Sequence, residues 1–328
     1  RELRHRGGGL FGANPLTGSI NVVTLNMARI GYTSDNVAEF KRQVRKLMEY
    51  AREICDAKRE MLELYMEGGL YPYSRFYLEG VKKATGEYFK NHFSTIGLNG
   101  MNEACRNLLG VDITTEEGNA FAVEIMDFMN RVIQLFQEET GSLWNLEASP
   151  AEGTSYRFAR LDKKLYPNIL TAGTDEPYYT NSTQLPVGAT DDIFEAIELQ
   201  EKLQTAYTGG TVLHGFIGEQ IEDTETCKLF IRKIMENTAI PYITVTPTFS
   251  ICEDHGYIEG EHFTCPHCGK DAEVWTRVVG FHRPVQAWNK GKKEEFAERR
   301  TFDVQTSLHS EMLHETGGQI SEGTEQLA

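Results

Sequence analysis

The sequence has little basic charge and no long apolar run, and each absence excludes a class of protein. Its 328 residues include 33 lysines and arginines against 48 aspartates and glutamates, a formal net charge of −15. Proteins that bind nucleic acid need clustered cationic side chains to contact the phosphates, so we exclude nucleic acid as a partner. No apolar run approaches the roughly 18–20 residues needed to cross a bilayer, so we expect no membrane partner. A small nucleotide stays open as a ligand, because a few backbone N–H groups can hold a phosphate.

Cysteines are also few, with six in the whole chain. Three of them, Cys252, Cys265 and Cys268, fall within 17 residues, and the others lie in stretches with helical periodicity. A disulfide framework would be spread through a shorter, secreted chain. We therefore expect a protein of the reducing cytoplasm in which the clustered cysteines bind a metal.

The sequence lacks an initiating methionine and a signal-peptide pattern, since it begins at Arg1. We therefore expect a piece of a longer protein.

Long amphipathic stretches alternate with short β-branched runs, which is typical of an α/β fold. Apolar residues recur with the helical period over residues 37–54 and 121–136, and the run at residues 20–25 predicts a buried strand. Residues 211–246 have the pattern strand, helix, strand, a crossover that usually joins parallel strands. After about residue 250 the periodicity stops and glycine, cysteine and histidine dominate, so we expect a small separate module there.

Two short motifs in this module have the spacing of zinc ligands. Cys252 and His255 form one pair and Cys265 and Cys268 the other, each pair with two residues between its members. Zinc prefers tetrahedral sulfur and nitrogen ligands, and this spacing lets a tight turn aim both side chains at one ion. Four protein ligands leave no open position, so we predict a structural zinc site. For the fourth ligand we favour His255 by the symmetry of the two pairs, with His262 and His267 as alternatives.

A short β-branched run then meets Gly280, which is followed by a loop containing proline. Taken alone, Gly280 would be a turn residue, because glycine permits a positive φ.

Together with the cysteine pairs, this segment resembles the C-terminal end of the anaerobic (class III) ribonucleotide reductases. In that family a zinc knuckle pair directly precedes an R-V-x-G-[YF] loop that carries a glycyl radical, and residues 277–281 are RVVGF here. Further stretches, at residues 17–32, 95–103, 149–157 and 179–186, are similar to family motifs in the same order.

The resemblance implies a fold and a domain organisation. Residues 1–248 would be the C-terminal part of the catalytic barrel, half of a ten-stranded α/β barrel of the ribonucleotide-reductase and glycyl-radical type. Residues 249–304 would be the zinc-knuckle and glycyl radical module, and residues 305–328 a polar tail.

The resemblance also implies the chemistry. A radical-SAM activating protein would remove a hydrogen from Gly280. The radical would oxidise a cysteine to a thiyl, which starts the reduction of a ribonucleoside triphosphate to the deoxyribonucleotide. A glycine suits this role because a radical on its α-carbon is delocalised over both flanking amides when the backbone is flat. The complete enzyme would be a homodimer.

The family's thiyl cysteine lies shortly before a G-G-G-L-F-G stretch, which is found here at residues 7–12. No cysteine precedes Cys55, so we expect the thiyl residue in an N-terminal half outside this sequence, and this chain to be inactive alone. Cys55 and Cys105 are interpreted as inert buried thiols. Formate-using members carry an asparagine near the position of Ser19, so the resemblance favours a dithiol protein as the reductant.

Several polar residues are further candidates. Glu152 could shuttle the proton of the departing water as a general acid and base, although a solvated loop glutamate fits the pattern equally well. A polar loop could bind substrate phosphate or be a plain turn; its residues are Asn181, Ser182 and Thr183. His214, within an apolar strand, is interpreted as a core histidine, and the basic run at residues 290–293 as a solvated face.

Two alternatives remain open at this point. One is a different glycyl radical enzyme, although those relatives generally lack zinc knuckles directly before the glycine. The other is a non-catalytic zinc-binding interaction module. A nucleic-acid adaptor of that kind would need a basic face, whereas the knuckle region is acidic; its acidic residues are Glu253, Asp254, Glu259 and Glu261.

Overall fold

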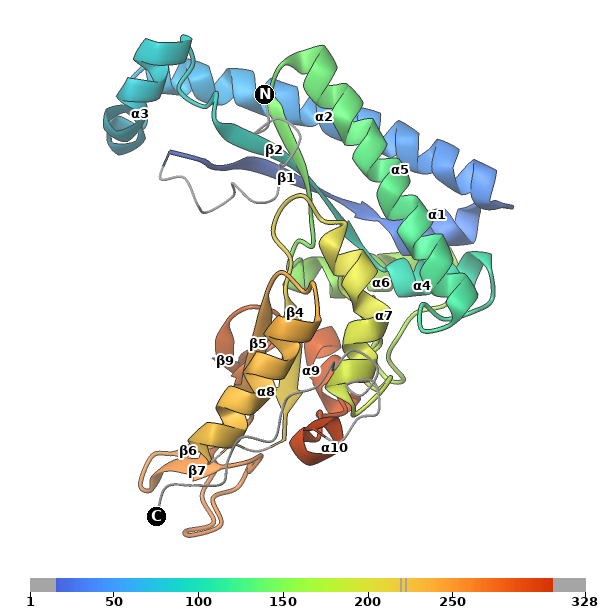
Figure 1. Ribbon diagram of the computed structural model, residues 1–328, viewed down its shortest axis with the longest axis vertical. Helices are drawn as coiled ribbons and strands as arrows, with labels where there is room; N and C mark the ends of the chain where they lie inside the picture. The colour runs from blue at the N-terminus through green and yellow to red at the C-terminus, as the bar shows by residue number, and fades with distance from the viewer. Residues whose placement is uncertain (1–15, 219, 222, 309–328) are drawn as a thin grey trace, which may run out of the picture.

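The computed structural model describes residues 16–218, 220–221 and 223–308 (Figure 1). The glycine-rich stretch at residues 7–12 and the polar tail beyond residue 308 lie outside the described residues. No described helix has both the length and the apolar composition that a membrane crossing requires.

The first part of the chain forms a parallel three-stranded sheet with helices packed on one face (Figure 1). The strands lie in the order β1-β2-β3, and the register pairs Leu25 with Leu98 and Ile96 with Leu146. The elements are β1 (Gly18–Asn26), α1 (Met27–Thr33), α2 (Val37–Glu67), α3 (Pro72–Thr85), β2 (His92–Asn99), α4 (Met101–Leu108), α5 (Glu116–Thr140), β3 (Leu143–Glu147) and α6 (Glu152–Leu165).

The main core lies between this sheet and the two long helices α2 and α5. The apolar stripe of α2 includes Phe40 and Val44, both fully buried, and Phe40 packs edge-on against Phe121 of α5. Ile54, which the helical period places on the same stripe, is 46% exposed. Over 31 residues the stripe drifts around the helix, and Cys55 takes the buried position instead.

The second part contains the crossover that the sequence predicts. Strands β4 (Leu213–Ile217) and β5 (Ile243–Pro247) pair in parallel, and α8 (Thr224–Asn237) connects them. Asp223 caps α8 by accepting a hydrogen bond from the Thr226 backbone N–H at 2.7 Å. Phe230 and Ile234 of α8 are buried beside Ile193 of α7 (Ile193–Thr205), which closes a second, smaller core.

The third part is a four-stranded antiparallel sheet in the order β7-β6-β8-β9. Its elements and the following helices are β6 (Phe249–Cys252), β7 (Gly256–Glu259), β8 (Glu273–Arg277), β9 (His282–Pro284), the 3-10 turn η3 (Val285–Ala287), α9 (Lys290–Ala297) and α10 (Val304–Leu308). Helix α10 returns to the second part, where the Ser307 hydroxyl accepts a hydrogen bond from the Ile193 backbone N–H at 3.2 Å.

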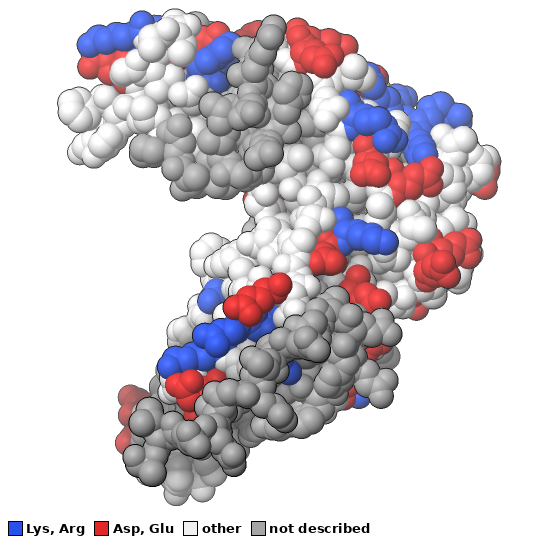
Figure 2. Space-filling model, viewed as in Figure 1, with Lys and Arg blue, Asp and Glu red and all other residues white. Residues whose placement is uncertain are grey.

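The molecule is hollowed between the first part and the other two. Figure 2 shows a deep concavity on one side, and the described residues along its inner end are mostly uncharged in this view. The three-stranded sheet lies above this hollow and the antiparallel sheet below it (Figure 1).

A buried carboxylate joins three segments where the sheet meets α6. Asp162 is fully buried and accepts hydrogen bonds from Asn26 Nδ2 at 2.7 Å and Tyr179 Oη at 2.8 Å. The guanidinium of Arg29 also pairs with it, with its Nε at 2.7 Å. Asp162 thereby ties α6 to the end of β1 and to the segment that leads into residues 180–183.

Removing the charge of Asp162 should therefore be costly. In Asp162→Asn the amide cannot accept all of these bonds and leaves the Arg29 charge without its partner, so we expect a loss of about 3 kcal/mol in the free energy of unfolding. Urea denaturation measures the difference. The control Glu225→Gln breaks an exposed helix pair with Lys228 and should cost about 0.5 kcal/mol or less. Equal effects in the two variants would contradict the prediction.

Candidate functional site

The two cysteine pairs lie on two turns of the antiparallel sheet module. Cys252 ends β6 and His255 lies in the turn before β7, while Cys265 and Cys268 lie in the loop that leads to β8. A glycine with a left-handed backbone follows each pair directly, Gly256 at φ +69° and Gly269 at φ +71°. Only glycine adopts this conformation without strain, so both turns can curl tightly enough to aim their side chains inward.

The four side chains converge on one point. Their ligand atoms all lie within 4.8 Å of one another. Cys252 Sγ is 3.7 Å from Cys268 Sγ, and His255 Nδ1 is 3.7 Å from the sulfurs of both Cys252 and Cys265. A tetrahedral zinc site with metal–sulfur bonds of about 2.3 Å has edges of about 3.6–3.8 Å between its ligand atoms. The donor set and its spacing therefore fit a zinc ion.

The two histidines predicted as alternative ligands are placed differently. His267 lies beside the cluster with its ring centroid 5.3 Å from that of His255, and it is not among the four converging residues. The backbone N–H of His262 donates to Ser250 Oγ at 2.8 Å.

Gly280 lies in the turn between β8 and β9. The turn is closed by the Val278 backbone N–H, which donates to the Phe281 carbonyl at 3.1 Å. Val278 and Val279 are buried, whereas Gly280 and Phe281 are exposed. The φ of Gly280 lies outside the left-handed region, and a Cβ at this position would have no atom within 4 Å. Gly280 is therefore a turn residue, but neither a left-handed φ nor a close neighbour requires glycine at this position.

Glu152 lies against this turn although 128 residues separate it from Gly280. It is the first residue of α6, and its carboxylate lies 3.4 Å from Arg283 Nη1 of β9. Asn289 Nδ2 also donates to the Glu152 carbonyl at 3.4 Å. The fold thus brings the predicted acid and base residue to β9, the strand that directly follows the turn of the predicted radical glycine.

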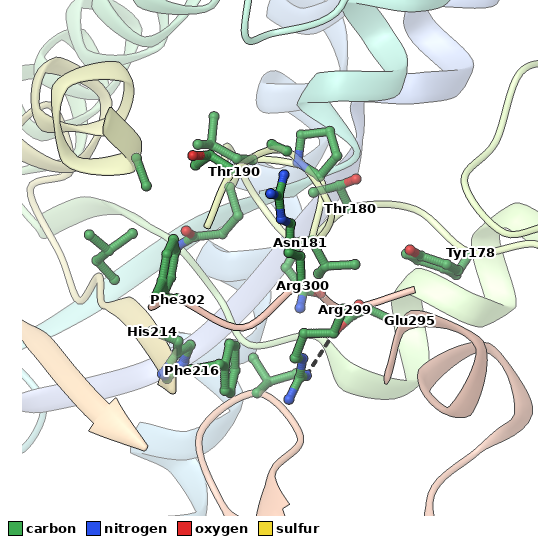
Figure 3. Close-up of a pocket in the computed structure, with 18 of the residues that line it drawn as sticks. Tyr178, Thr180, Asn181, Thr190, His214, Phe216, Glu295, Arg299, Arg300 and Phe302 are labelled. Carbon is green, nitrogen blue, oxygen red and sulfur yellow. Dashed lines mark ion pairs between the residues drawn. The ribbon is translucent and has the colours of Figure 1, made fainter. Parts of the chain in front are cut away.

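Two of the three polar loop residues are buried in this chain. Thr183 Oγ1 is 3.0 Å from Tyr207 Oη, and Ser182 Oγ donates to the Ser149 carbonyl at 3.4 Å. Asn181 instead lines a cavity of about 90 Å³ together with Val278 and Val279 of the glycine turn. Figure 3 shows Asn181 on the far side of this cavity from His214 and Phe216.

A residue without a predicted role, Glu103, fixes this loop. Its fully buried carboxylate accepts from the Thr180 backbone N–H at 3.0 Å and from Thr180 Oγ1 at 2.8 Å. Burial raises its pKa above the ordinary range. Glu103 lies within the motif at residues 95–103, but the sequence gives no sign that its partner is 77 residues away.

His214 is half-buried and lines the same cavity as Asn181. Its Nδ1 lies 2.8 Å from Thr244 Oγ1, and burial, with nearby cationic side chains, lowers its pKa to about 4. It is therefore neutral near pH 7.

The basic run at residues 290–293 is not wholly a solvated face, so that interpretation is wrong for one residue. Lys292 is fully buried and pairs with Glu295, which also lies 3.6 Å from Arg299 Nη2. Lys290 and Lys293 belong to the same helix, and Lys290 is exposed and pairs with Glu176 at 3.1 Å.

The comparisons with known proteins show the family of the chain. The family model described as anaerobic ribonucleoside-triphosphate reductase matches residues 2–302. The chain belongs to this family. The anaerobic ribonucleoside-triphosphate reductases of Haemophilus influenzae and of enterobacteria phage T4 are 25% and 28% identical to it. Both alignments cover 86% of this chain, but only 42% and 48% of the relatives.

Solved structures show the same likeness. One, titled "Anaerobic ribonucleotide reductase", has a TM-score of 0.72 and 26% identity over 88% of this chain and 45% of its own length. The Thermotoga maritima anaerobic ribonucleotide reductase with MES in the active site has a TM-score of 0.69 and 25% identity, over 86% of this chain and 46% of its own. The chain thus spans less than half the length of these relatives.

For this reductase-family chain, the metal cluster predicts a clear effect of ligand removal. Cys265→Ser should lower the zinc content from one ion per chain and unfold the module, because metal binding energy is folding energy in small metal sites. Elemental analysis and thermal unfolding measure both effects. Cys227→Ser, which changes a cysteine on α8 outside the cluster, should keep the zinc. A folded, zinc-free wild-type protein would contradict the assignment.

Two other cysteines should be chemically silent. Burial raises the pKa of Cys55 and of Cys105 to about 12. At pH 8 each of these thiols is therefore ionised in only about one molecule in ten thousand. We expect maleimide to label partly exposed Cys227 in the native protein, and Cys55 and Cys105 only after unfolding. Peptide mass spectrometry reads each site. Labelling of Cys55 or Cys105 in the native protein would contradict this prediction and make that thiol a candidate for radical transfer.

Proposed function

We propose that this chain is the radical-bearing part of an anaerobic ribonucleoside-triphosphate reductase and that Gly280 carries the glycyl radical. The observation that carries the proposal is the family match over residues 2–302, which includes the exposed turn of Gly280 directly after the Cys/His cluster. Neither the φ of Gly280 nor the space around it requires glycine. The proposed role supplies a chemical reason for glycine, since a radical on the α-carbon is delocalised over both flanking amides only where no side chain obstructs a flat backbone.

The parallel strands support the barrel part of the proposal. Among the described residues, five strands run in two parallel sheets, β1-β2-β3 and β4-β5. We propose that they form half of a ten-stranded barrel around the hollow of Figure 2. The other half, with the thiyl cysteine, would come from the N-terminal part of the enzyme, and the complete enzyme would be a cytoplasmic homodimer.

We assign the zinc a structural role at Cys252, His255, Cys265 and Cys268. Four protein ligands would leave it no position for substrate. Its contribution would be to hold the sheet from which the glycine turn projects.

The substrate roles follow from where the polar residues lie. Glu152 would exchange the proton of the departing 2′ hydroxyl, because it lies beside the glycine turn and its side chain keeps partial access to solvent. Asn181 would contact the triphosphate, with Ser182 and Thr183 holding the loop through their buried hydroxyls. A radical-SAM activating protein would install the radical, and a dithiol protein would supply the electrons.

The test is the radical itself. Anaerobic incubation with a radical-SAM activase, S-adenosylmethionine and a reductant should give a carbon-centred EPR doublet, and air should then cleave the chain at residue 280. Gly280→Ala should abolish both effects and change the free energy of unfolding by no more than about 1 kcal/mol, since the added methyl group meets no atom.

A matched glycine gives the control. Gly80 in α3 also has open space around it and no positive φ, so Gly80→Ala should keep the doublet and the cleavage. No doublet from the wild-type chain with an activase of proven competence would overturn the proposed function.

A further inference from the structure

Arg277 folds back over the turn that it precedes. It is the last residue of β8, and its guanidinium Nη1 donates to the carbonyl oxygen of Gly280 at 2.7 Å. Its Nε donates to Thr246 Oγ1 on β5 at 3.0 Å. One side chain thus bridges the parallel sheet of the second part and the peptide that follows the α-carbon of Gly280.

The guanidinium is held from more than one side. Thr246 is 1% exposed, so its hydroxyl is fixed by the surrounding packing. The backbone carbonyl of Arg277 accepts from Arg299 Nη1 at 3.4 Å, and Arg299 stacks on Phe216 of β4 with its guanidinium carbon 3.6 Å from the ring centroid. The position of Arg277 is therefore set by residues outside the turn.

The charge of Arg277 is also available to the carbonyl. Among the described residues no carboxylate forms an ion pair with it. Burial lowers the pKa of His282, and the positive charge of Arg277 lowers it further. The same charge adds to the effect of burial in lowering the pKa of His214. Within the described part of the chain, the charge of Arg277 thus lies near two histidines and pairs with no carboxylate.

A cation at this carbonyl acts differently on glycine and on its radical. In the radical, the amide nitrogen donates electron density and the carbonyl withdraws it, so one contributing form places negative charge on the carbonyl oxygen. A charge-assisted hydrogen bond is about twice as strong as a neutral one, and it strengthens where charge builds up. The same bond fixes the rotation of the Gly280 carbonyl, which keeps the two flanking amides in a common plane.

We propose that Arg277 is a positioning residue for the radical on Gly280: it holds the Gly280 carbonyl in the plane that delocalisation requires and draws spin density away from the α-carbon. This inference rests on the proposed function, because it requires the radical to form on Gly280.

The line shape of the EPR doublet tests it. The splitting comes from the remaining α-hydrogen and grows with the spin density on the α-carbon. Arg277→Gln should therefore give a larger splitting than the wild type, whatever the yield of activation. Arg277→Lys keeps a positive charge but lacks the planar guanidinium. Its splitting should therefore lie between those of the wild type and Arg277→Gln. We also expect the anaerobic radical to decay about tenfold faster in Arg277→Gln, the loss expected for one charge-assisted hydrogen bond.

Two variants separate this role from general effects. Arg283→Gln removes an equal charge from the same turn, but its partner is Glu152, so its splitting should match that of the wild type. Thr246→Val removes the oxygen that anchors Arg277 Nε without changing the turn, and should shift the splitting in the direction of Arg277→Gln. Circular dichroism and zinc content check that each variant is folded.

The outcomes are distinct. No doublet in the wild type overturns the proposed function. A wild-type doublet with unchanged splitting in Arg277→Gln and Thr246→Val overturns the role of Arg277 and leaves the proposed function standing. If the activase does not accept Arg277→Gln, the splitting of Thr246→Val decides.

Discussion

Four ligand atoms from two turns converge on one point in the module that bears Gly280, and a metal ion bound there would hold the two turns together. The antiparallel sheet module has two small apolar clusters. Ile258 and Ala272 lie with two of the cysteines around the ligand atoms, and the second cluster includes Val278 and Val279 of the glycine turn. Around the ligand atoms the apolar core is small, so a bound metal would add folding free energy there. β6 leads from the cluster and pairs with β8, and β8 ends at Arg277, so the position of the glycine turn follows from that of the metal ligands.

The module joins the rest of the chain through apolar packing, such as that of Phe302 against the second core, and through polar contacts. Arg283 meets Glu152, Lys290 meets Glu176, and the Tyr178 hydroxyl donates to Glu298 at 2.7 Å. The two surface ion pairs each add little stability. Together the three contacts orient the module, because each one joins it to a defined position on the rest of the chain.

The sequence predicted the elements that depend on local pattern and missed those that depend on distant partners. The crossover β4-α8-β5 follows from periodicity, and the metal cluster from spacing, because both patterns lie within a few dozen residues. The burial of Lys292 could not be read locally, since a lysine in a basic run is usually solvated and only Glu295 and the surrounding packing make its burial tolerable. The contact of Glu103 with Thr180 likewise exists only in the folded chain.

Glycine itself shows why residue type alone could not settle the site. Gly256 and Gly269 are explained by backbone geometry, because both have a positive φ directly after a ligand pair. Gly280 has neither a positive φ nor a close neighbour at the Cβ position, so sterics would accept alanine there. All three positions are glycine in the sequence. Only the structure shows which of them need glycine for the backbone conformation. The backbone of Gly280 does not use the conformational freedom of glycine, and its carbonyl accepts a hydrogen bond from the Arg277 guanidinium. Together these two features support the proposed chemical role of Gly280 better than the residue type alone does.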